Sequence, residues 1–71
     1  MNIVFTTHAK ERMKQRRISR QEIEAILEKP DTISYTYEDK KIALKYFKNK
    51  TIKVVFSQKD ETVVIITAYA D

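Results

Sequence analysis

The sequence predicts an α+β fold with a short N-terminal strand, two helices and then a four-strand antiparallel meander sheet, with the helices on one face. Three observations favour this fold. Apolar residues recur at helical spacing only in the first 30 residues. Beyond residue 32 they alternate as they do in strands. Turn-forming residues separate these segments, and 71 residues suit a single domain over 1–71.

The N-terminal part is expected to contain one strand and one helix. Residues 2–5 are mostly apolar and read as the first strand. Thr7 is a suitable N-cap, because its hydroxyl can accept a hydrogen bond from the first turn of a helix. In that helix Ala9 and Met13, four residues apart, would face the core.

A second helix is predicted from its start and stop signals. Ser19 and Glu22 form an S-x-x-E capping box, in which each side chain bonds the backbone N–H of the other residue. Pro30 disfavours helical angles in the residue before it, so the helix should end there. Its apolar stripe is formed by Ile23, Ile26 and Leu27.

The remainder of the chain is expected to form four strands. They cover residues 33–37, 42–47, 52–56 and 62–69. The last is apolar on both faces, as expected for a central strand. The chain contains no glycine, so its turns should depend on Asn49, in a hairpin with Lys50, and on Asp60, which tolerate left-handed backbone. One sheet face would receive the helices, and the other would be open or covered by a ligand or partner.

Composition excludes several classes of function. The chain has no cysteine, which excludes disulfides, thiolate metal sites and cysteine nucleophiles. A single histidine makes a catalytic zinc site unexpected, and the lack of glycine excludes a phosphate-binding loop. We therefore expect no metal and no cofactor. The sequence has no long apolar run and no leader-like start, so a cytoplasmic protein without a membrane span is expected.

Positive charge is concentrated in two segments of a chain whose net charge is +4. Residues 8–20 contain six lysines and arginines against Glu11 alone, and residues 40–53 contain six lysines and no acidic residue. If both segments fold onto one side, they suit a polyanion such as RNA. The alternative is that the lysines keep a small sheet soluble. The predicted nucleic-acid-binding residues are Lys10, Arg17, Lys41, Lys48, Lys50 and Lys53.

The candidate site begins with His8, Arg12 and Arg16, which are spaced four residues apart and would form one row on a helix. Histidine exchanges protons near neutral pH, and arginine binds phosphate through paired N–H donors. The structural alternative is an ordinary solvent-facing histidine, with arginines that pair with Glu11 or with carboxylates of the second helix.

Cleavage of RNA without metal requires a base for the 2′-hydroxyl, charge stabilisation at phosphorus and an acid for the leaving oxygen. His8 could be base or acid, the two arginines and Lys45 could stabilise charge, and Thr67 could hydrogen-bond the phosphate. Tyr69 or Tyr46 could position or donate a proton. The predicted catalytic residues are therefore His8, Arg12, Arg16, Lys45, Thr67 and Tyr69.

Each supporting residue also has a structural reading. Lys45 would be a lysine of the sheet surface and Thr67 an ordinary strand residue. Tyr35, Tyr37 and Tyr46 are expected to be packing residues rather than a platform on which bases stack.

Four segments carry a resemblance to a known family. They are Thr7-His8-Ala9-x-x-Arg12-Met13-x-x-Arg16-Arg17-Ile18-Ser19-x-x-Glu22-Ile23, then Lys29-Pro30-Asp31, Val54-Val55-Phe56 and Ile65-Ile66-Thr67-Ala68-Tyr69. The sequence resembles a small bacterial domain-of-unknown-function family (number 4258). That family is similar in architecture to RelE/ParE-type toxins of the barnase-EndoU-colicin-RelE ribonuclease fold. Its members usually have glycine where this chain has Arg17. This difference affects the backbone angles of the turn between the helices and not the residues of the suspected site.

The resemblance implies a fold type that includes metal-independent ribonucleases acting on messenger RNA, as well as inactive members and members that poison a DNA gyrase. It places His8, Arg12, Arg16, Lys45 and Thr67 on polar positions of the suspected site. Our leading hypothesis is a toxin-like enzyme that binds single-stranded or ribosome-presented RNA and leaves 2′,3′-cyclic phosphate ends. The second is a non-catalytic module for nucleic acid or an acidic protein. The third is an interaction domain that pairs, through its open sheet face or edge, in a homodimer or with an antitoxin-like acidic chain.

Overall fold

The computed structural model describes residues 2–36 and 38–71, so Tyr37, expected at the end of a strand, lies outside the described residues. The α+β class is confirmed, with both predicted helices present. In chain order the elements are β1 (Asn2–Phe5), α1 (Thr7–Arg16), α2 (Arg20–Glu28), β2 (Thr32–Tyr35), β3 (Lys41–Tyr46), β4 (Thr51–Lys59) and β5 (Thr62–Ala70).

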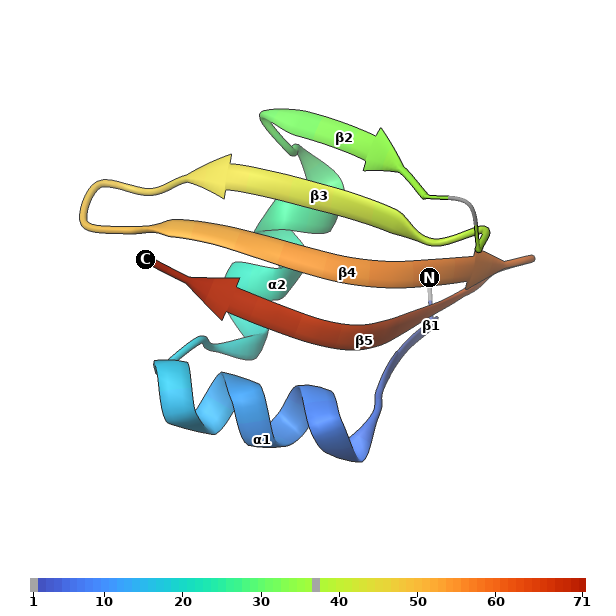
Figure 1. Cartoon of the computed structure of the whole chain (residues 1–71), viewed down its shortest axis with the longest axis horizontal. Helices are drawn as coiled ribbons and strands as arrows, with labels where there is room; N and C mark the ends of the chain where they lie inside the picture. The colour runs from blue at the N-terminus through green and yellow to red at the C-terminus, as the bar shows by residue number, and fades with distance from the viewer. Residues whose placement is uncertain (1, 37) are drawn as a thin grey trace.

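The sheet is five-stranded and mixed, in the order β1-β5-β4-β3-β2 (Figure 1). The expected antiparallel meander is confirmed for β2 to β5. The expected number of four strands in the sheet is wrong, because the sheet has five. β1 adds a fifth strand parallel to β5, with Ile3 opposite Val63 and Phe5 opposite Ile65. The alternation of side chains predicts which face a residue occupies, but it carries no information about a distant pairing partner.

Helix α1 is capped by Thr6, so the expected N-cap at Thr7 is wrong. Thr6 has extended backbone angles, and its Oγ1 accepts a hydrogen bond from the Ala9 N–H at 3.0 Å. The same hydroxyl donates to the Ile66 carbonyl at 3.0 Å. This second bond anchors Thr6, the single residue between the end of β1 and the start of α1, to β5.

The turn between the helices depends on Arg17, which has φ 56° and ψ 46°. The capping box is confirmed: Ser19 Oγ accepts from the Glu22 N–H at 3.1 Å, and Glu22 Oε1 accepts from the Ser19 N–H at 2.9 Å. Helix α2 ends at Glu28, two residues before Pro30, as expected.

Left-handed backbone occurs, among the described residues, at Arg17, Asp39 and Asp60. The predicted left-handed turn residue is confirmed at Asp60, whereas the prediction for Asn49 is wrong. The loop between β3 and β4 contains four residues and is closed by a hydrogen bond of 2.7 Å from the Phe47 N–H to the Lys50 carbonyl. This loop is longer than the two-residue hairpin in which both central residues are left-handed.

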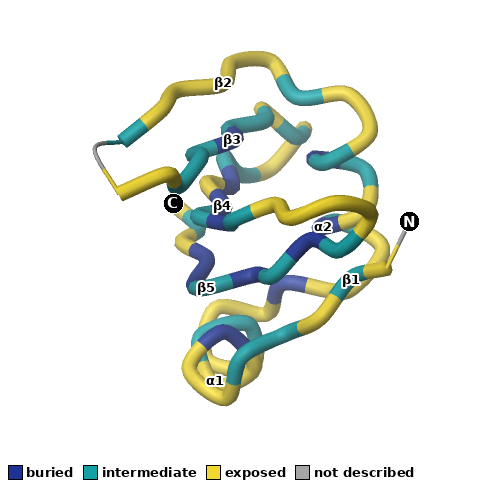
Figure 2. The backbone as a smooth tube through the Cα atoms, turned by 90° about the vertical axis from the view of Figure 1, so that its right-hand side faces the viewer, coloured by how far each residue is buried: buried dark blue, intermediate teal, exposed yellow. Residues whose placement is uncertain are grey.

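The core lies between the sheet and the helices. Helix α2 lies behind the sheet in Figure 1, while α1 runs along β5. Ala9, Ile23 and Ile26 are fully buried, and Met13 packs against the core as expected. Figure 2 shows that β2 is exposed along its whole length. The opposite face of the sheet is not covered by either helix. Within the described ranges, neither helix has the length and apolar character needed to cross a bilayer.

Candidate nucleic-acid interface

The predicted row lies on α1, which contains His8, Arg12 and Arg16 in three successive turns. Arg12 Nε donates to His8 Nε2 at 3.5 Å, and Arg12 Nη1 donates to Gln15 Oε1 at 3.1 Å. His8 and Arg16 are exposed, while Arg12 is partly buried. The fold therefore brings His8 and Arg12 into contact, with Arg16 one turn farther along the helix.

The arginines of this row are not neutralised by acidic residues. The ion pairs among the described residues are Arg20–Glu24, Lys40–Glu38 and Lys50–Glu22. Glu22 and Glu24 of the second helix are thus paired elsewhere. In the described ranges neither Glu28 nor Glu11 forms an ion pair with Arg12 or Arg16, which contradicts the alternative that carboxylates hold these arginines. Because no ion pair in the described ranges involves the row, both guanidinium groups can accept an anionic ligand.

Lys45 is placed away from the row. Its Nζ donates to the Lys29 carbonyl at 2.8 Å, just beyond the end of α2. A cation at this position stabilises the carbonyls that a helix leaves unpaired at its C-terminus. Since β3 packs against α2 whereas α1 packs against β5 and β1, the fold separates Lys45 from His8.

Thr67 and Tyr69 both lie on β5, and neither has a hydrogen bond to His8 in the part of the chain that the structure describes. Thr67 is buried, and its Oγ1 has no hydrogen-bond partner among the described residues. Tyr69 lies opposite Lys53 and is 43% exposed. Their predicted contact with the phosphate bound by the row thus stays a prediction.

The tyrosines differ from their expected packing role. Tyr35 is 74% exposed and Tyr46 is 63% exposed, so the expectation that they pack in the core is wrong for both. Tyr35 lies on the edge strand β2, and Tyr46 ends β3, where no helix covers it. Both tyrosines belong to strands, but neither position is covered by a helix.

Lys50 has an intramolecular role. Its Nζ lies 3.2 Å from Glu22 Oε2 and donates to the Arg17 carbonyl at 3.0 Å. Partial burial raises the pKa of Glu22, but hydrogen bonds from Ser19 and the charge and hydrogen bond of Lys50 outweigh it, so the pKa lies below its usual 4.5. Lys50 therefore joins the β3–β4 loop to the turn between the helices, and little of its charge is left for a ligand.

The other predicted binding residues are more accessible. Lys10, Arg17, Lys48 and Lys53 are exposed, and no ion pair in the described ranges involves them. Lys41 lies over the ring of Tyr35, with its Nζ 5.8 Å from the ring centroid. The two basic segments thus contribute cations from α1, from the β3–β4 loop and from the uncovered sheet face.

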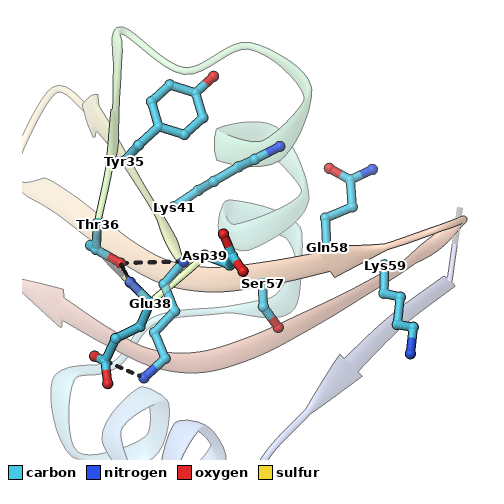
Figure 3. A pocket seen from close by; sticks show the side chains of 9 residues that line it. Tyr35, Thr36, Glu38, Asp39, Lys41, Ser57, Gln58 and Lys59 are labelled. Atoms are coloured by element: carbon cyan, nitrogen blue, oxygen red, sulfur yellow. Dashed lines mark hydrogen bonds and ion pairs between the residues drawn. The ribbon is translucent and has the colours of Figure 1, made fainter.

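A shallow hollow of about 700 Å³ lies at the turn between β2 and β3 (Figure 3). Thr36 Oγ1 stabilises this turn by accepting hydrogen bonds from the N–H groups of Glu38 and Lys40. Of the predicted site residues only Lys41 lines the hollow, and Lys59 is a further cation there that sequence reasoning missed. The strand register could have revealed it, since Lys59 ends β4 beside the turn. Within residues 2–36 and 38–71 no group of three acidic or histidine side chains is placed to hold a metal ion.

The chain belongs to the family described as Domain of unknown function (DUF4258), whose model matches residues 5–70. The match includes the α1 row and extends through β5, which confirms the family resemblance seen in the sequence. The comparisons with curated proteins and with solved structures find no match. The further likeness to RelE/ParE-type toxins stays a prediction.

Proposed function

We propose that this chain is a small RNA-binding domain that holds phosphate on the α1 row, and that His8 gives the row metal-independent endoribonuclease activity. The observation that supports the proposal is a pair of arginines that form no ion pair with any described residue, one of which directs its Nε at His8 Nε2. Arginines without a carboxylate partner can bind phosphate. The contact between Arg12 and His8 would hold that phosphate beside a group that can transfer protons.

The chemistry depends on the position of the His8 ring beside Arg12. A neutral imidazole accepts a hydrogen bond on one nitrogen, and His8 Nε2 is the nitrogen that faces the Arg12 Nε–H. The bond of 3.5 Å is long, and a phosphate oxygen that binds Arg12 would replace it and free Nε2. His8 would then remove the 2′-hydroxyl proton while the 2′-oxygen attacks phosphorus.

The same step breaks the bond from phosphorus to the 5′-oxygen. The 5′-oxygen takes a proton from water or from the imidazolium, which leaves a 2′,3′-cyclic phosphate and a 5′-hydroxyl. Arg12 and Arg16 would stabilise the charge that develops on the nonbridging oxygens. Lys45 is not included, because its ammonium group is bound to the end of α2.

A non-catalytic module is the second candidate, and the exposure of His8 favours it. His8 lies on an open helix surface and does not line the hollow, whereas catalytic bases are commonly enclosed and desolvated. The same cationic surface would also suit a ribosome-bound RNA or an antitoxin-like acidic protein.

The two candidates are separated by incubating the protein with single-stranded RNA in EDTA and analysing the RNA ends. The wild type should produce 2′,3′-cyclic phosphate ends, and His8→Ala should lower the rate by about 100-fold or more while circular dichroism stays unchanged. Arg12→Gln and Arg16→Gln should weaken both binding and cleavage. Lys14→Gln is the matched control, since it removes the same charge from α1 outside the row.

Each outcome has a distinct meaning. Cleavage that persists in a folded His8→Ala protein would remove His8 from the chemistry. Binding without cleavage, weakened by the arginine variants but not by Lys14→Gln, would establish the second candidate. In that case each lost phosphate contact should reduce the slope of log K against log salt by about 0.7. Failure of the wild type to bind RNA would contradict the ribonuclease and the nucleic-acid-binding form of the second candidate, and would leave only binding to an acidic protein.

A further inference from the structure

The uncovered face of the sheet has an unusual charge distribution. Strand residues alternate between the two faces, so every second position of β3, β4 and β5 points away from the helices. None of the five strands contains an aspartate or glutamate. The strand charges that project from this face are Lys53 and Lys59. Asp31 reaches its margin, where the carboxylate accepts a hydrogen bond from the Tyr46 N–H at 2.7 Å.

Two exposed tyrosines flank Lys53 on this face. Tyr69 lies directly opposite Lys53, which lies opposite Leu44, and Tyr46 is two residues beyond Leu44 on the same side of β3. Strand spacing and rise place the Cα atoms of the two tyrosines about 12 Å apart, with Lys53 between them. Tyr46 is 63% exposed and Tyr69 is 43% exposed, so both rings are open to solvent.

The face also borders α1, the helix that carries the row. β1 pairs only with residues Thr62 to Ile65 of β5. Beyond Ile65 the edge of β5 is occupied by α1, which begins where the Thr6 N–H donates to the Ile65 carbonyl (Figure 1). A strand of nucleic acid that crosses β3, β4 and the Tyr69 end of β5 would therefore reach α1 next.

We infer that this face is a base-stacking platform for single-stranded RNA, with Tyr46 and Tyr69 as the stacking rings and Lys53 as the phosphate contact between them. The inference rests on the proposed RNA-binding function and specifies its ligand. Aromatic rings interleaved with lysines are the combination that binds unpaired bases and backbone together. Duplex RNA does not fit this role, because its bases are already stacked and paired.

Charge favours RNA over a second copy of the chain. In a two-fold dimer the same face would meet itself. The Lys53 side chains of both copies would then be buried in a face whose strands supply no carboxylate to neutralise them. The phosphates of RNA supply that negative charge.

The inference is tested with three RNA probes of equal length: a 12-nucleotide uridine RNA, its abasic counterpart, and the same RNA paired with oligoadenylate. Tyr46→Ala and Tyr69→Ala should each weaken binding to the uridine RNA by about tenfold. Tyr46→Phe and Tyr69→Phe are the matched controls and should bind like the wild type, since they keep the ring. The chain contains no tryptophan, so binding of the uridine RNA should also quench tyrosine fluorescence directly.

The probes separate this inference from the proposed function. Binding to the abasic RNA should be weak, insensitive to the tyrosine variants and sensitive to Arg12→Gln. Equal binding of the uridine and abasic RNAs, with only the arginine variants defective, would overturn the platform and leave the proposed function standing. Loss of all binding by the wild type would overturn both. A dimer that Tyr69→Ala dissociates in sedimentation equilibrium would assign the face to protein contact instead. If Tyr69→Ala does not fold, Tyr46→Ala carries the same test.

Discussion

Arg17 connects the two helices in a left-handed backbone conformation, with φ 56° and ψ 46°. In this conformation a Cβ atom crowds the following carbonyl, which costs about 1 kcal/mol or more for a residue other than glycine. The Arg17 carbonyl is fixed by Lys50, and the Ile18 N–H donates to the Met13 carbonyl at 2.8 Å. The surrounding bonds therefore hold the turn in place despite the crowding.

We predict that Arg17→Gly is about 1 kcal/mol more stable to unfolding than Arg17→Ala. Both variants lose the same positive charge, so the comparison isolates the backbone term. Urea denaturation followed by circular dichroism gives the two free energies of unfolding. Equal values would mean that the turn changes its conformation when the side chain is removed.

The row in α1 was predictable from the sequence because it depends on spacing alone. A helix brings residues four apart together, and the His8–Arg12 contact follows from that geometry. The roles of Lys45 and Lys50 were not predictable, since each depends on a hydrogen bond to a carbonyl 16 or 33 residues away. Two lysines of the basic segment 40–53 therefore bind different backbone carbonyls.

At the scale of elements, α1 is held at its start by a single hydroxyl that forms two hydrogen bonds. Thr6 Oγ1 accepts from Ala9 and donates to the carbonyl of Ile66, so it caps the helix and attaches it to β5. Thr7 is exposed and is already within the helix. In the sequence Thr6 and Thr7 are equally suitable N-caps. Thr6 is the cap because β1 ends at Phe5, directly before it.

Thr6→Ala should lower the free energy of unfolding by about 1–2 kcal/mol, because it removes the cap and leaves the Ala9 N–H without its partner. Thr7→Ala is the matched control and should change stability by less than about 0.5 kcal/mol. Thermal and urea unfolding measure both variants. A larger effect for Thr7→Ala would assign the N-cap to Thr7 and contradict the role of Thr6.

At the scale of the whole molecule, Glu22 and Lys50 connect the helical half to the sheet. The salt bridge of 3.2 Å joins the first turn of α2 to the loop between β3 and β4. Because the pKa of Glu22 is lower in the folded than in the unfolded chain, this carboxylate stabilises the fold above pH 4.5. The stabilisation is lost as the pH falls through the lowered pKa.

We predict that Glu22→Gln destabilises the protein by about 1 kcal/mol at pH 7 and by progressively less as the pH falls below 4.5 through the lowered pKa of Glu22. At low pH the wild-type carboxylate is protonated and resembles the amide. Glu24→Gln is the matched control, because its partner Arg20 and Glu24 itself are largely exposed and the pair should contribute little at either pH. A difference that stays constant with pH would exclude the charge of Glu22 as its cause.

The antiparallel meander was predictable because consecutive strands usually pair with one another. The position of β1 was not, since its pairing with β5 joins residues about 60 positions apart in the chain. The sequence predicts a second sheet face that is either open or covered by a ligand or partner. Its exposed tyrosines became visible only when the register placed Tyr46 and Tyr69 around Lys53.

The strand order has a consequence for protein synthesis. β5 follows every other strand in sequence, yet it lies between β1 and β4. While a ribosome is still translating the residues before Thr62, β1 has no neighbour, and one edge of β4 presents unpaired N–H and carbonyl groups. Such an edge readily pairs with other chains. Nascent or prematurely terminated chains should therefore be the aggregation-prone forms, and arrival of the final strand should give the sheet its protection.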